Sequence, residues 1–260
     1  MIDLFRRTGT AIAHFVYGIY AWLTFLVAIL LVLLTTLFVP GIDRRRRLLT
    51  LWARGFFAFA GIRTSVQGLG NLPDHHCIVV ANHCSYLDGV ILQALLPPRF
   101  AYVIKGEMRD VPVVHFVLRR AGSKFVERFE TAGSARDART LVKAASAGES
   151  LAFFPEGTFI GEPGLGRFRA GAFSAAIKGG LPVVPVVISG SRKILPANKY
   201  LPVPGSVRID ILTAIDGSDA AYRNGVELAE LSRGRMLEVL DEPDLLVNNQ
   251  QPASQPNIGQ

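Results

Sequence analysis

Apolar and polar positions divide the chain into an apolar N-terminal run and a longer region of mixed pattern. Residues 15–39 contain no charged side chain. At about 1.5 Å per helical residue, this run is long enough to cross the roughly 30 Å hydrocarbon core of a bilayer, so we predict a membrane-spanning helix. A signal peptide is the alternative, but its apolar region is usually about 7 to 15 residues long. Here Pro40 and an arginine cluster follow, without a clear small-residue cleavage site.

Basic residues flank the apolar run unequally. Arg6 and Arg7 precede it, whereas residues 44–47 are four arginines and Arg54 follows them. This imbalance predicts a single-pass protein of the inner (cytoplasmic) membrane, with the catalytic part of the chain in the cytoplasm. The net charge of +7 is compatible with nucleic acid or with anionic lipid. Because four of the charges lie directly beside the apolar run, we expect membrane lipids as partners and no nucleic acid.

The segment after the arginine cluster combines basic and aromatic residues. Residues 48–62 include Trp52, Phe56, Phe57 and Phe59. This composition predicts a helix that lies in the membrane interface or packs beside the anchor, and ordinary core packing stays open as an alternative. We therefore assign residues 1–62 to a membrane anchor with an interfacial helix.

Short apolar runs alternate with helical patterns after residue 63. Unbroken apolar strands are typical of a largely parallel sheet covered on both faces. We predict strands at 77–81, 100–104, 124–126, 151–154, 183–188 and 207–212, and helices at 87–95, 134–148, 170–178 and up to about 240. The expected fold is α/β, with a central, mostly parallel sheet flanked by helices at 63–240. Residues 241–260 are expected to be a disordered polar tail, because few apolar side chains are present from Asn248 onward.

The strongest candidate for chemistry is the segment Asn82-His83-Cys84-Ser85-Tyr86-Leu87-Asp88, where a predicted strand ends and a helix begins. Strand ends in open α/β sheets are common ligand sites. A carboxylate beside a histidine can fix its tautomer, so that His83 can take a proton from an alcohol with Asp88 behind it. Two alternatives stay open: Ser85 and Asp88 also match a helix capping box, and Cys84 is a conceivable nucleophile. Cys77 and Cys84 form no CxxC pair and no disulfide framework, which fits the cytosolic compartment.

A second candidate segment is Phe153-Phe154-Pro155-Glu156-Gly157-Thr158, another strand end that continues into a loop. Gly157 allows backbone N–H groups to approach a ligand, and Glu156 and Thr158 offer hydrogen bonds to phosphate or hydroxyl groups. By itself this pattern also fits an ordinary turn.

Together these segments resemble the glycerolipid acyltransferase superfamily, whose best-known members acylate glycerol-3-phosphate or 1-acylglycerol-3-phosphate. The resemblance covers about residues 64–215, and four family motifs occur in order. They are Asn82, His83, Ser85 and Asp88; then Gly122, Phe125, Val126, Glu127 and Arg128; then Phe154 to Thr158 with Phe168, Arg169 and Gly171; and last the apolar, proline-containing strand 181–186.

The resemblance implies an acyltransferase domain at 63–240 that transfers a fatty acyl chain from acyl-CoA or acyl carrier protein to a lysophospholipid hydroxyl. The first expected acceptor is 1-acyl-sn-glycerol-3-phosphate, and no metal or resident cofactor is expected. His83 is the implied base and Asp88 its orienting partner. The implied substrate-binding residues are Asn82, Ser85, Arg128, Glu156, Gly157, Thr158 and Arg169. Phe159 and a glycine-rich insertion at 161–166 depart from the family pattern and leave other acceptors open, such as a lyso-aminolipid.

Three other kinds of protein share some of these features. A membrane-anchored thioester or ester hydrolase would use His83 to activate water in place of a lipid hydroxyl. An inactive lipid-binding protein would not need both His83 and Asp88. A metalloenzyme would need one of His75, His76 or His115 beside this pair, and no His-x3-His or comparable spacing is present.

Overall fold

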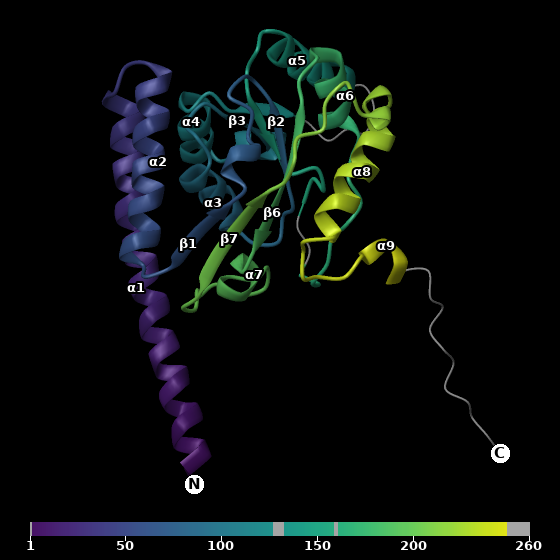
Figure 1. The fold of residues 1–260 in the computed structure, drawn as a ribbon. Coiled ribbons are helices and arrows are strands. Elements are labelled where there is room, and N and C mark those ends of the chain that lie inside the picture. Colours follow the sequence, from purple (N-terminus) through teal and green to yellow (C-terminus); the bar gives the residue numbers. More distant parts are fainter. Residues whose placement is uncertain (1, 127–132, 159–160, 249–260) are drawn as a thin grey trace, which may run out of the picture.

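The computed structural model describes residues 2–126, 133–158 and 161–248. Among these residues a seven-stranded sheet forms the centre of the molecule, in the spatial order β1-β7-β6-β2-β5-β3-β4 (Figure 1). Five neighbouring strands from β6 to β4 are parallel, whereas β7 pairs with β6 in the antiparallel sense and β1 runs parallel to β7. The predicted mostly parallel α/β fold is therefore confirmed. The strands are β1 (Arg63–Gln67), β2 (Ile78–Ala81), β3 (Ala101–Lys105), β4 (Lys124–Val126), β5 (Leu151–Phe153), β6 (Val183–Ser189) and β7 (Ser206–Ile211).

Helices cover both faces of the sheet (Figure 1). Helices α2 and α3 pack on one face, and α5, α6 and α8 pack on the other. The helices are α1 (Ile2–Phe38), α2 (Ile42–Phe59), α3 (Asp88–Leu95), α4 (Pro112–Arg120), α5 (Gly133–Ser146), α6 (Gly171–Gly179), α7 (Ser191–Ile194), α8 (Gly225–Leu237) and α9 (Leu245–Asn248). Short 3₁₀ turns lie at Leu69–Asn71, Gly106–Asp110 and Ala220–Arg223.

Strand β2 shows why the sheet has two apolar faces. Alternate side chains of a strand point to opposite faces. Ile78 and Val80 accordingly pack with α5, α6 and α8, whereas Val79 and Ala81 pack with α2 and α3. All four side chains are fully buried. A strand that is apolar at every position thus fits only the middle of a three-layer structure.

Helix α1 runs antiparallel beside α2, so the two form a helical hairpin at one side of the domain (Figure 1). The hydroxyl of Tyr17 donates to the carbonyl of Ala60 at 3.0 Å, and Trp52 Nε1 donates to the hydroxyl of Thr35 at 2.9 Å. Among the described residues, one helix is long and apolar enough to cross a membrane, Thr8–Phe38 within α1. The predicted span is therefore an apolar helix that lies along α2 for much of its length. Its outer side exposes large apolar side chains, among them Phe15, Ile19, Leu23, Leu26 and Leu30.

Two of the arginines that follow the apolar run face the domain. Arg46 donates through Nε to the carbonyl of Ala121, at the end of α4, at 2.9 Å. Arg54 donates through Nε to the carbonyl of Ala94, in the last turn of α3, at 2.7 Å. The last carbonyls of a helix lack intrahelical donors and carry partial negative charge, so these guanidinium groups stabilise both helix ends. The expected lipid contact of the arginine cluster therefore concerns its other members.

The domain extends beyond the predicted boundary at residue 240. Glu242 forms an ion pair with Arg192, Asp244 forms one with Arg233, and α9 follows. Residues 241–248, predicted as the start of the disordered tail, thus pack against the domain. Residues 249–260 lie outside the described residues.

Candidate active site

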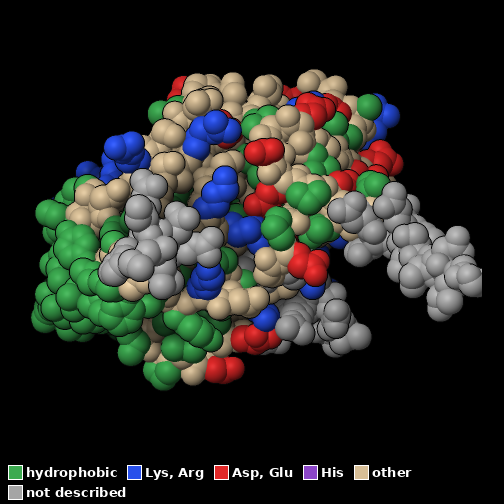
Figure 2. Space-filling model, turned by 90° about the horizontal axis from the view of Figure 1, so that it is seen from below, with side chains coloured by type: hydrophobic (Ala, Val, Ile, Leu, Met, Phe, Trp, Pro, Cys, Tyr) green, Lys and Arg blue, Asp and Glu red, His purple; other side chains and the backbone are tan. Residues whose placement is uncertain are grey.

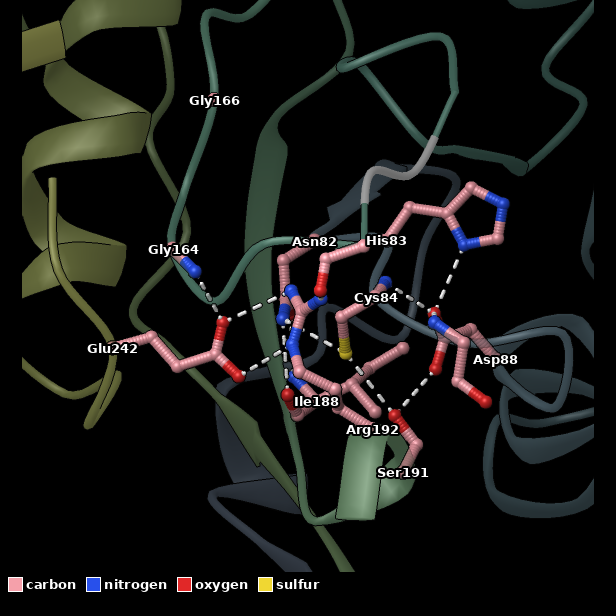
Figure 3. Close-up of polar contacts among 12 residues, drawn as sticks. Asn82, His83, Cys84, Asp88, Gly164, Gly166, Ile188, Ser191, Arg192 and Glu242 are labelled. Atoms are coloured by element: carbon pink, nitrogen blue, oxygen red, sulfur yellow. Dashed lines mark hydrogen bonds and ion pairs between the residues drawn. The ribbon is translucent and has the colours of Figure 1, made fainter. Parts of the chain in front are cut away.

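Three adjacent parallel strands deliver the polar groups of the site to one edge of the sheet. Asn82 and His83 follow β2, Glu156 follows β5 and Ser191 follows β6, and β2 is the middle strand of the three. The carboxyl ends of neighbouring parallel strands lie together, which is where α/β proteins hold ligands. Figure 3 shows His83, Asp88 and Ser191 gathered at this edge.

His83 and Asp88 form a hydrogen-bonded pair. Nδ1 of His83 lies 2.9 Å from Oδ2 of Asp88, with 20% of the histidine side chain exposed and the aspartate side chain fully buried. Oδ2 also accepts the N–H groups of Cys84 at 2.6 Å and Ser85 at 2.8 Å, and Oδ1 accepts the hydroxyl of Ser191 at 2.7 Å. A carboxylate surrounded by donors presents only acceptor atoms, so Nδ1 is the protonated nitrogen of the neutral imidazole. Nε2 then carries the lone pair that a general base requires.

The imidazole of His83 is also held by an aromatic ring. Phe154, directly after β5, stacks on it with a centroid distance of 4.2 Å and an interplanar angle of 19°. The ring therefore has a fixed plane as well as a fixed tautomer. Both features reduce the reorganisation that proton transfer requires.

Asn82 and Ser85 use their side chains inside the protein. The amide of Asn82 donates to the carbonyl of Ile188 at 3.0 Å and accepts the N–H of Ile188 at 2.7 Å. The hydroxyl of Ser85 donates to the carbonyl of Leu195 at 2.7 Å. Both residues are buried, so in this structure they connect the His83 segment to β6 and α7. Their expected contact with substrate stays a prediction.

Glu156 holds the backbone of His83. Its Oε1 accepts the N–H of His83 at 2.8 Å, and its Oε2 accepts the N–H of Gly166 at 3.0 Å. Burial raises the pKa of Glu156 above its ordinary value, while the two backbone donors and nearby positive charge act in the opposite direction. The carboxylate thus joins two stretches of chain, and its expected role in acceptor binding is not tested by these contacts.

Gly157 and Thr158 lie at the exposed rim of the site, and Arg169 lies against Gly157. Gly157 has a φ of +79°, and a Cβ atom there would lie 2.9 Å from Nε of Arg169. Only glycine suits both the backbone conformation and this approach. The structure thus brings Gly157 and Arg169 together, and Gly157 directly follows Glu156, which contacts His83. Arg128 lies outside the described residues.

The surroundings of Cys84 do not favour covalent catalysis. Its thiol is buried and lies 3.1 Å from the hydroxyl of Ser191. Burial, followed by the charge of Asp88, raises the pKa of Cys84 to about 12. A thiol with this pKa is almost entirely protonated at neutral pH and is a poor nucleophile. As to the metalloenzyme alternative, the described part of the chain holds no group of three or more His, Cys, Asp or Glu side chains that could bind a metal ion.

Comparison with known proteins identifies the family. The model of the Acyltransferase family matches residues 63–189. The chain is 32% identical over 212 residues to a chloroplastic 1-acyl-sn-glycerol-3-phosphate acyltransferase of Brassica napus, an alignment that covers 78% of this chain and 61% of that protein. The matched region, residues 63–189, belongs to the Acyltransferase family. The resemblance drawn from its four motifs is therefore confirmed.

Other members of the superfamily differ in the acceptor that their names give. A lyso-ornithine lipid O-acyltransferase of Pseudomonas aeruginosa is 30% identical over 161 residues, covering 61% of this chain and 60% of that protein. The chain spans 61%, 52% and 66% of the length of three of its curated acyltransferase relatives.

A solved acyltransferase structure shares the fold. The crystal structure of the 1-acyl-sn-glycerophosphate acyltransferase of Thermotoga maritima superposes with a TM-score of 0.69 at 23% identity. The superposition covers 88% of this chain and 98% of that one. This likeness supports the arrangement of the sheet and its flanking helices.

Three residues around the His83–Asp88 pair were not predicted from the sequence. Ser191, Arg192 and Glu242 approach the site from α7 and from the segment before α9. The position of Ser191 could have indicated it, because Ser191 comes two residues after the end of β6, the apolar strand that neighbours β2. Glu242 carries none, because it lies in a stretch whose composition resembles a polar tail.

Proposed function

We propose that this chain is an O-acyltransferase that moves a fatty acyl chain from acyl-CoA or acyl carrier protein to the hydroxyl of a lysophospholipid. The proposed acceptor is 1-acyl-sn-glycerol-3-phosphate, and the product is phosphatidate. The observation that carries the proposal is the His83–Asp88 pair, oriented by four hydrogen bonds to one buried carboxylate within a family-matched domain. Relatives named as acyltransferases for this acceptor support the choice.

In the proposed reaction, Nε2 of His83 takes the proton of the acceptor hydroxyl while that oxygen attacks the thioester carbonyl. A C–O bond forms, the C–S bond breaks, and the leaving thiolate receives a proton from the imidazolium. Asp88 stabilises the imidazolium through Nδ1–H. General-base assistance of this kind contributes about 10²- to 10⁴-fold to the rate. No metal or resident cofactor takes part in these steps.

The acceptor phosphate needs a cationic partner near the rim. Arg128 is the proposed partner from the family motif, and Arg169 beside Gly157 is the second candidate. A guanidinium can bind a phosphate by two parallel hydrogen bonds, which an ammonium cannot reproduce. Arg128→Ala should therefore raise the KM for lysophosphatidate strongly, with little effect on the donor KM, and Arg128→Lys should restore only part of the loss. Equal losses on a phosphate-free acceptor would assign Arg128 a structural role, and no loss on either acceptor would move the phosphate site to Arg169.

A second candidate acceptor is a lyso-aminolipid. The similarity to a lyso-ornithine lipid O-acyltransferase favours it, together with Phe159 and the insertion at 161–166. This acceptor also presents a hydroxyl to His83, so the catalytic steps are unchanged. Parallel assays with a lyso-ornithine lipid and lysophosphatidate separate the two.

Helix α1 is the proposed membrane anchor, with the catalytic domain on the cytoplasmic side. Figure 2 shows apolar side chains gathered where α1 lies, with Lys and Arg side chains beside them. Apolar side chains that enter lipid beside cations that meet anionic headgroups are typical of a membrane contact. Because α1 lies along α2, insertion of α1 brings α2 close to the lipid as well.

Removal of residues 1–40 should release the chain from the integral membrane fraction, and carbonate-resistant association of this variant would contradict the anchor. A reporter after Gln260 should be active in the cytoplasm. A tag before Met1 that a probe reaches only from the side opposite the cytoplasm supports a full span by α1. A tag that the probe reaches from the cytoplasm shows that α1 inserts only partly.

The experiment that tests the proposed reaction is lipid profiling by mass spectrometry. Purified protein is incubated with a panel of lyso-lipids and with both acyl donors, and the acylated lipid and free fatty acid are measured together. Acylated lysophosphatidate in excess over free fatty acid supports the proposal. Release of free fatty acid alone would show that the chain is a hydrolase.

A further inference from the structure

A glutamate near the end of the described chain joins two stretches that flank the catalytic pair. Oε1 of Glu242 accepts from Nε of Arg192 at 3.0 Å, and its Oε2 accepts from Nη2 of the same guanidinium at 3.1 Å. Oε2 also accepts the N–H of Gly164 at 2.8 Å. Figure 3 shows the Glu242 carboxylate between Arg192 and Gly164. The ion pair is largely shielded from water, with 11% of the arginine and 20% of the glutamate side chain exposed.

The first stretch leads from Glu242 to the aspartate of the pair. Arg192 is the neighbour of Ser191 in α7, a helix of only four residues. The hydroxyl of Ser191 donates to Oδ1 of Asp88 at 2.7 Å. A two-bonded guanidinium fixes the position of α7, and with it the donor that orients the carboxylate.

The second stretch leads to the histidine. Gly164 lies two residues before Gly166, whose N–H donates to Oε2 of Glu156 at 3.0 Å. Oε1 of the same glutamate accepts the N–H of His83 at 2.8 Å. The glycine-rich insertion at 161–166 thus supplies a donor that helps to fix the backbone of the base.

The C-terminal segment holds this insertion at further points. The N–H of Leu165 donates to the carbonyl of Pro243 at 2.9 Å. Arg233 donates to the carbonyl of Gly166 at 2.7 Å and pairs with Asp244. Residues 242–244 therefore contact the insertion directly and through α8.

We propose that Glu242 is a positioning residue for the His83–Asp88 pair, acting through Arg192 and Ser191 on Asp88 and through Gly164, Gly166 and Glu156 on His83. This inference rests on the proposed acyltransferase function for its kinetic consequence. Catalytic groups displaced by a fraction of an ångström lose much of their rate advantage while binding is retained. Substitution of Glu242 should accordingly lower kcat and leave KM nearly unchanged.

The test compares Glu242→Gln with Glu238→Gln, which removes the same charge from an exposed position four residues earlier. A glutamine offers one acceptor oxygen and places an NH₂ group against a donor, so the three contacts of Glu242 cannot all be kept. Glu242→Gln should lower kcat about tenfold with KM within about twofold. Glu238→Gln should match the wild type. A chain that ends at Asn248 keeps the segment and should also match.

Hydrogen–deuterium exchange provides a readout that does not depend on activity. In Glu242→Gln, amide exchange should accelerate both in residues 161–170 and in residues 186–196, and in Glu238→Gln in neither. If Glu242→Gln does not fold, Arg192→Lys takes its place, because lysine keeps the charge but cannot form the two-bonded contact. A kcat equal to that of the wild type, or unchanged exchange in either stretch, would overturn the proposal. Absence of acyl transfer in the wild type would reject the proposed function, while the exchange result would still decide whether Glu242 holds both stretches.

Discussion

Oδ2 of Asp88 accepts the imidazole Nδ1–H of His83 and, from the same side of the helix start, the backbone N–H of Ser85. The contact with Ser85 resembles one half of the capping box that the sequence offered, but α3 begins at Asp88 itself, with Leu87 as its N-cap, so the contact closes the turn before the helix. The contact with His83 can orient the imidazole. Ser85 itself directs its hydroxyl to the carbonyl of Leu195. One buried carboxylate therefore holds both the turn that precedes α3 and the imidazole of His83.

This shared carboxylate predicts a double effect of Asp88→Asn. The asparagine NH₂ would face a backbone N–H or the imidazole N–H, and the orientation of the base would be lost. We expect kcat to fall by about 10²- to 10⁴-fold and the melting temperature to fall as well, because a buried donor would be unpaired. Steady-state kinetics and thermal melts of the purified variant measure both effects. A lower melting temperature with unchanged kcat would leave Asp88 only a structural role in the turn before α3.

Ser191→Ala should remove a hydrogen bond from the other oxygen of the Asp88 carboxylate. The variant removes the donor to Oδ1 of Asp88, and we expect lower kcat and a stability loss of about 1 to 3 kcal/mol. Ser232→Ala is the matched control, because Ser232 is fully buried and its hydroxyl has no hydrogen-bond partner in the described part of the chain. That control should change neither quantity. Equal kcat for both variants would show that Ser191 does not support the catalytic pair.

The raised pKa of Glu156 predicts that the stability difference between the wild type and Glu156→Gln depends on pH. Burial raises its folded-state pKa above that of the unfolded chain, so the folded state keeps a proton over a pH range in which the unfolded state has lost it. The contribution of Glu156 to the free energy of unfolding therefore falls as the pH rises through this range. Glu156→Gln removes that dependence. The stability of the wild type relative to Glu156→Gln should be greatest below the ordinary glutamate pKa of about 4.3 and should fall as the pH rises above it.

Thermal melts of the two proteins across this range provide the measurement. Ser232→Ala, which changes a buried side chain without changing a titratable group, should show no such trend relative to the wild type. A relative stability of the wild type that grows with pH would contradict the direction assigned to Glu156.

Cys84 should be dispensable for chemistry. Its pKa of about 12 leaves almost no thiolate at neutral pH. We expect Cys84→Ala to retain kcat within about threefold and iodoacetamide to leave the native enzyme active. Cys77, whose pKa burial raises to about 11, should also resist alkylation. Inactivation in proportion to alkylation of Cys84 would instead support Cys84 as a covalent nucleophile.

The sequence predicted the centre of the fold because buried parallel strands have a distinctive pattern. β2 and β6 are apolar at nearly every position, and the runs predicted for them agree with the structure within about one residue. β1 was not predicted, since it is an edge strand with mostly exposed side chains and a polar sequence. α4 was also missed, although Pro112 at its first turn is a typical helix-start signal.

The sequence predicted only part of the site, for a physical reason. His83 and Asp88 lie five residues apart, so a local motif contains both. Ser191 and Glu242 reach the pair only because β6 lies beside β2 and because the last segment folds back, and neither relation is visible in local spacing. The inward direction of the Glu156 carboxylate likewise depends on where Gly166 is held.

The most direct test of the central claim is the rate of acyl transfer by wild-type protein and by His83→Ala, measured by mass spectrometry of the acylated lipid. His83 lies outside the apolar core, so the variant should fold and melt like the wild type. We expect wild-type protein to convert lysophosphatidate and an acyl thioester to phosphatidate, and His83→Ala to be slower by about 10²- to 10⁴-fold. A folded His83→Ala protein with turnover near that of the wild type would contradict the proposed mechanism.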